Sequence, residues 1–317
     1  MRASTTAGRR RGPRTAPALS LPGAASLGVR SLLGGPRRTA RAVAVFPSTT
    51  YLKVDGAAEP IVIALVTTDA VRPPNAVVLA APARQEPFRG VREGDVAFVG
   101  DGGVDVATRL RVRIRRWWDP TPVLGPLSLA RLAHGARALG ELAGPWGLTG
   151  QPLPDVLAGA CAAGDLAHAV DAAERIVGLG PGLTPSGDDA LAGLLLALRL
   201  LGGAVSGGGR AVWLADWIGA AVTAYACERT TILAATLLQC AARGQASLET
   251  TAVLRGISGQ EPLAPAARRL IEVGHTSGAD VAWGLLTGCR AALALSGPAR
   301  GGAPRHAAAG PPATIDP

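Results

Sequence analysis

The stretch LRVRIRRWWDP, residues 110–120, contains the main change of pattern along the chain and decides the fold class. Apolar and basic side chains alternate along its first half, as they do in a β-strand with one buried face. Leu110, Val112 and Ile114 share one face, and Arg111, Arg113 and Arg115 share the other. We expect the arginine face to be solvated, or to contact an anion or a partner subunit.

Short β-type segments precede this stretch. They are rich in valine and isoleucine and are separated by turn-forming residues such as Pro73-Pro74-Asn75, which is a pattern typical of strands. The segments span residues 42–46, 61–67, 76–80, 96–99 and 110–117. Together they predict a small antiparallel sheet or barrel.

After Pro120 the pattern becomes helical, because alanine and leucine recur at helical spacing. The expected helices span residues 128–142, 151–161, 166–176, 188–201, 211–227, 231–242, 248–257, 265–273 and 279–295. The prediction is an α+β fold with a small β-rich N-terminal domain, residues 22–120, and a larger, predominantly α-helical C-terminal domain, residues 121–296. Residues 1–21 and 297–317 are expected to be disordered tails.

The net charge of +9 originates in the N-terminal segment. Residues 1–41 hold nine of the 32 basic residues and no acid. The rest of the chain therefore has 23 basic residues and 23 acidic residues, and its formal charge is zero. We interpret residues 1–21 as a disordered extension or an incorrectly assigned start, with a targeting signal or a nucleic-acid-binding arm as alternatives. The segment has no lysine and no interleaved aromatic residue, so nucleic acid is not the expected partner.

The four cysteines stand far apart, at Cys161, Cys227, Cys240 and Cys289. Their spacing excludes a zinc site and a disulfide framework, and we expect small buried thiols in a reducing compartment. The most apolar run, residues 191–201, is shorter than the roughly 20 residues of a membrane span. The sequence therefore predicts a cytoplasmic protein without a membrane partner.

The segment GLGPGLTPSGDD, residues 178–189, is the strongest candidate for a functional loop. Its glycines permit positive φ angles and close approach of a ligand, and its prolines restrict the unbound loop. Exposed amides before a helix N-terminus form an anion cradle. The candidate binding residues are Gly180, Gly182, Thr184, Ser186 and Gly187. A connector between two helices is the simpler alternative.

Asp188 and Asp189 begin the helix after this loop. Capping and compensation of the helix dipole could explain one of them. A pair of carboxylates beside an anion cradle could instead hold Mg²⁺ or act as a base or orienting acid. We therefore treat both as candidate catalytic residues, with Mg²⁺ as a possible cofactor. The loop lacks the G-x-x-x-x-G-K-[ST] pattern, which excludes an ordinary nucleotide P-loop.

A second segment, GHTSGAD at residues 274–280, resembles the first because serine, glycine and aspartate again introduce a helix. Helix capping is the structural alternative. Two such loops could converge on one polar pocket, with His275 as a catalytic or a structural histidine. The candidate binding residues here are Thr276, Ser277, Gly278 and Asp280.

A third cluster, Arg229-Thr230-Thr231, lies between the two loops in the sequence. The guanidinium of Arg229 suits bidentate binding of a carboxylate or phosphate. A structural salt bridge to Asp188 or Asp189 is the alternative. All three residues are candidates for substrate binding.

These segments together resemble the AllH-like family, a bacterial family typified by a subunit of oxamate carbamoyltransferase. The resemblance rests on residues 178–189 with Leu191-Ala192-Gly193, and it is supported by Thr230-Thr231 and by residues 274–280 with Gly284. It extends from about residue 22 to residue 296, more weakly over the β-rich half.

The resemblance implies transfer of a carbamoyl group between oxalurate and phosphate, giving oxamate and carbamoyl phosphate, in purine or allantoin catabolism. It also implies a hetero-oligomeric complex in which one partner resembles an acyl-CoA synthetase. The family supplies no established catalytic residues for transfer to this chain. A non-catalytic scaffold or regulatory ligand-binding subunit is the main alternative, and a nucleic-acid-binding protein is a third.

Overall fold

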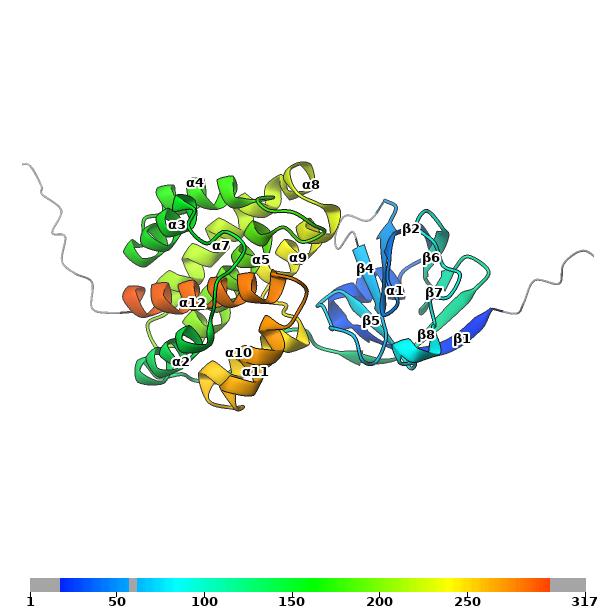
Figure 1. The fold of residues 1–317 in the computed structure, drawn as a ribbon, viewed down its shortest axis with the longest axis horizontal. Coiled ribbons are helices and arrows are strands. Elements are labelled where there is room, and N and C mark those ends of the chain that lie inside the picture. Colours follow the sequence, from blue (N-terminus) through cyan, green and yellow to red (C-terminus); the bar gives the residue numbers. More distant parts are fainter. Residues whose placement is uncertain (1–17, 57–61, 297–317) are drawn as a thin grey trace, which may run out of the picture.

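The computed structural model describes residues 18–56 and 62–296, which form a β-barrel and a helical part placed end to end (Figure 1). The barrel lies within residues 19–118, and all the longer helices follow it in the sequence. This arrangement confirms the predicted α+β fold class. Both expected tails fall largely outside the described residues, because the description begins at residue 18 and ends at residue 296.

Eight strands close the barrel in the order β1-β5-β4-β3-β2-β6-β7-β8. Their bounds are β1 Leu19–Ser26, β2 Arg38–Val45, β3 Thr49–Val54, β4 Val62–Val66, β5 Ala76–Leu79, β6 Val96–Gly100, β7 Gly103–Val106 and β8 Leu110–Trp118. Two short 3-10 helices, Leu27–Val29 and Ala83–Gln85, and the short helix α1, Arg30–Gly34, lie between strands. The five predicted segments correspond to β2, β4, β5, β6 and β8.

The barrel is not purely antiparallel, which corrects part of the prediction. Strands β1 and β8 pair in parallel and close the barrel, and β4 and β5 form a second parallel pair. Strand β1 begins at Leu19, inside the segment assigned to the basic tail. Pro22 lies opposite Arg113 in the β1–β8 register, and on the β5 side its carbonyl oxygen accepts a hydrogen bond from the amide of Ala80 at 3.0 Å.

The arginine face of β8 is only partly solvated. Asp105 on β7, almost buried, accepts ion pairs from Arg111 at 3.2 Å and from Arg113 at 3.3 Å. Arg37 binds the other oxygen of the same carboxylate at 2.8 Å. One acid therefore holds three arginines, two of them from the predicted face, while Leu110 and Val112 pack inside the barrel as expected.

The helical part closely follows the predicted segments. Its helices are α2 Leu129–Leu142, α3 Pro152–Ala163, α4 Leu166–Ile176, α5 Ser186–Leu196, α6 Gly202–Ala204, α7 Gly209–Ala224, α8 Ala226–Arg229, α9 Ile232–Ala242, α10 Leu248–Ser258, α11 Leu263–Ile271 and α12 Ser277–Leu295. A π-helical segment, Ala197–Leu201, continues α5. Their shared apolar core includes Leu191, Leu194 and Leu285.

Helices α5 and α12 form a tightly packed parallel pair at the centre of this part. A Cβ on Gly193 would overlap the carbonyl oxygen of Val281, and a Cβ on Gly284 would overlap that of Ala190. Farther along, Gly288 lies against Leu194 and Ala197 in the same way. The glycines therefore allow two backbones to touch, and they bring the N-termini of both helices to the same place.

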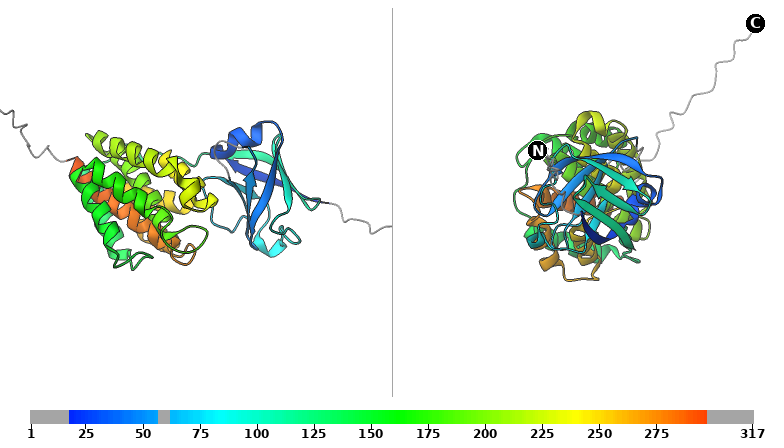
Figure 2. Two further views of the ribbon diagram at one scale, coloured as in Figure 1. Left: turned by 90° about the horizontal axis from the view of Figure 1, so that it is seen from above. Right: turned by 90° about the vertical axis from the view of Figure 1, so that its right-hand side faces the viewer.

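The barrel and the helical part lie next to each other along the long axis of the molecule (Figure 2). They contact each other through the segment that connects β4 to β5, residues 67–75, and through the chain around Pro120. The amide of Leu248 donates to the carbonyl of Arg72 at 3.1 Å, and the amide of Ala246 donates to that of Pro120 at 2.9 Å. Two cavities lie along this junction, and residues of the β4–β5 connection line both.

The cysteines agree with the prediction in three cases. Cys161, Cys240 and Cys289 are buried, and burial raises the pKa of each thiol to about 12. Cys227 is exposed, contrary to expectation, because it lies in the short helix α8 near the surface. Among the described residues, no helix combines the length and the apolar character of a membrane span.

Candidate functional site

The two serine-glycine-aspartate loops meet at the paired N-termini of α5 and α12. The hydroxyls of Thr184 and Ser277 lie 2.9 Å apart, and those of Ser186 and Thr276 lie 3.5 Å apart. Neither helix has a side-chain cap hydrogen bond. Conventional capping therefore does not account for these hydroxyls.

Glycines hold each loop against the helix that precedes it. A Cβ on Gly187 would overlap the carbonyl oxygen of Ile176 at the end of α4, and one on Gly278 would overlap that of Leu270 in α11. The two loops therefore have equivalent packing, which explains why the same residue types recur in both. These two glycines shape the backbone of the site.

Three acids are buried at this junction. Asp188 is 2% exposed, Asp189 is 7% exposed and Asp280 is fully buried. A buried carboxylate is costly unless hydrogen bonds and favourable dipoles surround it. The positive ends of two parallel helix dipoles supply part of that compensation, because all three acids lie in the first turn of α5 or α12.

Asp188 accepts hydrogen bonds from two other segments of the chain. One of its oxygens accepts a hydrogen bond from the amide of Gly178 at 3.0 Å, and the other accepts one from the hydroxyl of Thr230. Burial raises the pKa of Asp188, and these two hydrogen bonds oppose the shift. With both oxygens engaged, Asp188 connects the first loop to the start of α9.

Asp280 holds the segment between α2 and α3 over the helix ends. Its Oδ1 accepts a hydrogen bond from the amide of Gly147 at 2.7 Å. A Cβ on Gly147 would overlap the hydroxyl of Ser186. The neighbouring Trp146 stacks on Trp283 of α12 with ring centroids 4.2 Å apart.

Asp189 is the acid that reaches a cavity. It lines a pocket of about 330 Å³ between the helical part and the barrel. Burial raises the pKa of Asp189 to about 8, and the nearby carboxylates of Asp280 and Asp188 add to the increase. Hydrogen bonds from Ser277 and Thr184 oppose it. The Oδ2 atom is buried and has no hydrogen-bond partner.

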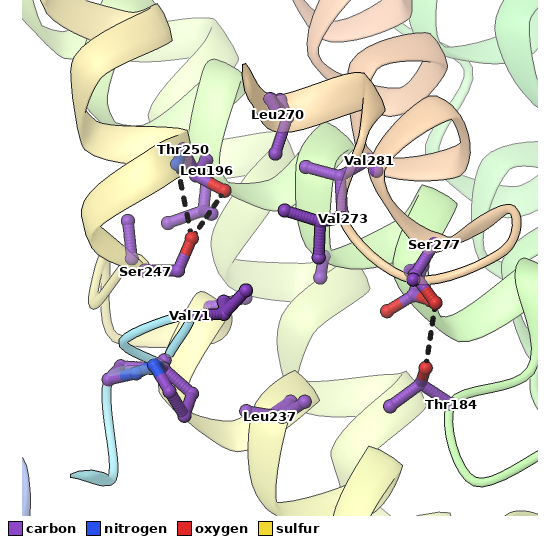
Figure 3. A pocket seen from close by; sticks show the side chains of 18 of the residues that line it. Val71, Thr184, Leu196, Leu237, Ser247, Thr250, Leu270, Val273, Ser277 and Val281 are labelled. Atoms are coloured by element: carbon purple, nitrogen blue, oxygen red, sulfur yellow. Dashed lines mark hydrogen bonds between the residues drawn. The ribbon is translucent and has the colours of Figure 1, made fainter. Parts of the chain in front are cut away.

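The pocket has two polar ends and an apolar middle (Figure 3). Thr184 and Ser277 lie at one end, and Ser247 and Thr250 lie at the other with their hydroxyls 2.9 Å apart. The side chains between them are apolar: Val71, Leu196, Leu237, Leu270, Val273 and Val281. No lysine, arginine or histidine of the described residues lines it.

The barrel contributes Tyr51 to the same pocket. Tyr51 lies on β3, and burial together with the charge of Asp189 raises the pKa of its phenol. Sequence reasoning did not identify Tyr51 or Gly147. The chain has only two tyrosines, and a tyrosine that is followed by a lysine two residues later resembles an ordinary half-exposed strand position.

Several predicted site residues lie away from the cavity. His275 and Arg229 are exposed and line neither cavity, and Arg229 forms no ion pair with Asp188 or Asp189. Thr231 is the N-cap of α9 and also donates to the carbonyl of Leu183. The side chain of Thr230 is engaged by Asp188.

The predicted anion cradle is present only in part. Gly178, Gly180 and Gly182 have φ angles of 78°, 110° and 97°, as the glycine pattern predicts. The amide of Gly187, however, donates to the carbonyl of Leu179 at 2.8 Å and is not available to a ligand. Any anion would therefore meet the exposed amides nearer the tip of the loop.

The acids do not fit a Mg²⁺ site formed by the Asp188–Asp189 pair. Both oxygens of Asp188 are engaged by protein donors, and Mg²⁺ requires oxygen ligands in near-octahedral geometry. Within the described ranges, no group of three or more His, Cys, Asp or Glu side chains could hold a metal ion.

Comparison with known protein families gives a match that falls on this site. The family model described as oxamate carbamoyltransferase subunit AllH matches residues 176–289. No curated protein and no solved structure matches the chain. The match runs from the end of α4 through most of α12, so it includes both loops and all three buried acids. This match confirms the family resemblance over residues 176–289.

Proposed function

We propose that the chain is a subunit of a carbamoyltransferase that acts on small anionic substrates, and that the pocket beside Asp189 receives the carbamoyl group. The family name supports a subunit of a multi-subunit enzyme. The observation that carries the proposal is the buried Asp189, whose Oδ2 has no partner at the polar end of a cavity. The proposed reaction converts oxalurate and phosphate to oxamate and carbamoyl phosphate in purine or allantoin catabolism.

The carbamoyl group suits this polar end because it is uncharged. Its NH₂ group donates hydrogen bonds and its oxygen accepts them. The polar end of the pocket offers matching groups, namely the carboxyl group of Asp189 and the hydroxyls of Thr184 and Ser277. A buried neutral group costs less free energy than a buried ion. The absence of basic side chains among the described lining residues is therefore compatible with a carbamoyl site.

The raised pKa gives Asp189 a specific role in the reaction. An oxygen of hydrogen phosphate forms a bond to the carbamoyl carbon, and the bond from that carbon to the oxamate nitrogen breaks. The nitrogen retains the electron pair and requires a proton, which a carboxyl group with a pKa of about 8 holds at neutral pH. Asp189 then regains a proton from the phosphate, so atoms and charge balance.

Negative charge develops on the carbamoyl oxygen during this step. Hydroxyl donors and helix N-termini that are fixed before the reaction stabilise such charge without reorganisation. Ser277 and Thr184 lie at the start of α12 and just before α5. The ionised phosphate and carboxylate parts of the substrates would face the amides of the exposed loop tip, Gly180 and Gly182, or a partner subunit.

Substitution of Ser277 by alanine tests this assignment. We expect Ser277→Ala to lower kcat of the assembled enzyme by about 10²-fold, the lower end of the effect of losing one donor to the developing charge. Ser48→Ala is the matched control, since Ser48 lines the barrel side of the same pocket. Equal activity of both variants with oxalurate and phosphate, at unchanged subunit assembly, would contradict the proposal.

The apolar middle of the pocket supports a second candidate function, a regulatory ligand-binding subunit without catalysis. Ligand pockets are mostly apolar with few polar groups, and this one agrees with that description. The two functions differ in one measurable respect. A regulatory subunit retains its effect on the assembled enzyme when Asp189 is replaced, provided that ligand binding survives.

A further inference from the structure

A second cavity of about 760 Å³ lies at the junction of the barrel and the helical part. Three barrel strands contribute to it, namely β1, β5 and β8, and α10 faces them. The loop between β4 and β5 separates it from the pocket of Asp189, because Val71 lines that pocket and Arg72 lines this cavity. The volume lies in the range of small-molecule sites.

The lining of this cavity is strongly basic. It contains four arginines and a single acid, Asp119, among the described residues: the arginines are Arg72, Arg115, Arg116 and Arg255. One carboxylate oxygen of Asp119 already accepts a hydrogen bond from the backbone amide of Thr121, at 2.8 Å. The cavity therefore presents an excess of positive charge.

Three of these arginines have no acidic partner among the described residues, and only Arg255 has one. Arg255 pairs with Glu261 at 3.2 Å, and Arg72 donates to the carbonyl of Thr68 at 3.3 Å. Arg115 and Arg116 are exposed, and neither forms an ion pair with a described carboxylate. This contrasts with Arg111 and Arg113 on the same strand, both of which pair with Asp105.

A β-bulge brings Arg115 and Arg116 to the same cavity. Gly23 on β1 pairs with Ile114 and the next residue, Ala24, pairs with Arg116, so Arg115 is the extra residue. Strict alternation would send consecutive side chains to opposite faces. Bulges re-aim side chains and occur frequently beside functional sites.

The cavity also offers an aromatic and apolar surface. Trp117 and Trp118 follow the two arginines, and both line the cavity. The indole Nε1 of Trp118 is buried and has no hydrogen-bond partner. Val78 and Leu79 of β5 add aliphatic surface.

We propose that this cavity binds a small phosphorylated ligand with an aromatic ring, the chemical class of the nucleotides. Guanidinium groups bind phosphate oxygens in bidentate geometry, and aromatic rings stack on tryptophan. The site is separate from the proposed carbamoyl pocket, and the proposal does not depend on the proposed carbamoyltransferase function.

The test is calorimetric titration of the full chain with ADP. We expect saturable binding that weakens with added salt. The variant Arg115→Glu/Arg116→Glu should bind at least about tenfold more weakly, because the charge-assisted hydrogen bonds of both guanidinium groups to the phosphates are lost. The matched control is Arg89→Glu/Arg92→Glu, which reverses two exposed charges that line neither cavity and should leave ADP binding unchanged.

The other outcomes contradict the proposal. Absence of saturable ADP binding, or equal affinity in the two double variants, would remove the site. Pyrophosphate that binds as tightly as ADP would exclude a contribution of the ring. If a single-stranded oligonucleotide bound more than about tenfold tighter than ADP, the ligand would be a nucleic acid and not a small molecule. Clusters of arginine and tryptophan also bind single strands.

Discussion

Replacement of Asp189 by asparagine should reduce kcat of the assembled carbamoyltransferase by about 10²- to 10⁴-fold, the range of effects ascribed to a positioned proton donor. Asparagine preserves the size of the side chain but cannot release a proton at neutral pH. The decrease should be larger than that of Ser277→Ala, because the leaving nitrogen loses its proton source. Steady-state turnover of oxalurate and phosphate measures it.

Loss of folding would not explain this result, because Asp189→Asn should be at least as stable as the wild type at alkaline pH. Folding raises the pKa of Asp189 from its unfolded value near 4 to about 8. The folded chain therefore binds more protons between these values, and its stability falls as pH increases through them. Asparagine does not titrate and escapes that loss, which thermal unfolding at pH 6 and pH 9 would show.

The matched control for activity is Asp155→Asn, which changes an exposed acid in the first turn of α3. We expect wild-type turnover from this variant. Normal turnover by Asp189→Asn, in an enzyme with normal subunit composition, would show that Asp189 is not the proton donor.

Substitution of Gly284 by alanine should destabilise the fold by about 3 kcal/mol or more, at the upper end of the range for overpacking. The new Cβ would overlap the carbonyl oxygen of Ala190 and approach the amide nitrogen of Leu194, and these backbone atoms of α5 cannot move independently of the helix. Separation of α5 from α12 would also disturb the contacts between Thr184 and Ser277. Urea unfolding of the full chain provides the measurement.

Gly159→Ala in α3 is the control for the effect of a glycine-to-alanine substitution in a helix without steric overlap. Gly159 is a helical glycine, and no atom lies within 4 Å of a Cβ built on it. Alanine there should stabilise the helix by about 0.5–1 kcal/mol. If the two variants had the same stability, the close packing of α5 on α12 would be wrong.

The helical part could be predicted well from the sequence because its signals are local. The segment 166–176 matches α4, and Ser128 caps α2 where the pattern places it. The sequence pattern does not predict three strands, β1, β3 and β7. Two of them have a physical reason: β1 contains Pro22 and Gly23, and β7 is a four-residue strand that begins with a glycine, so both resemble turns. Long-range parallel pairing stabilises β1, and no local pattern encodes such pairing.

The candidate site was only partly accessible to sequence reasoning. The likeness of the two loops indicated that they meet, and the contact of Thr184 with Ser277 supports this. The sequence does not distinguish Asp188 from Asp189. Only the fold shows that Thr230 and Gly178 donate hydrogen bonds to the two oxygens of Asp188. His275 and Arg229 were selected for their chemistry, whereas exposure and position depend on the complete fold.

The protonation state of Asp189 is the most direct test of the account. In the full chain labelled with ¹³C at the aspartate side chains, the signal of Asp189 can be assigned by its absence from the Asp189→Asn variant. We predict a titration midpoint near pH 8, far above the usual aspartate range. A midpoint near pH 4 would contradict the account, because an ionised Asp189 could not donate a proton at neutral pH.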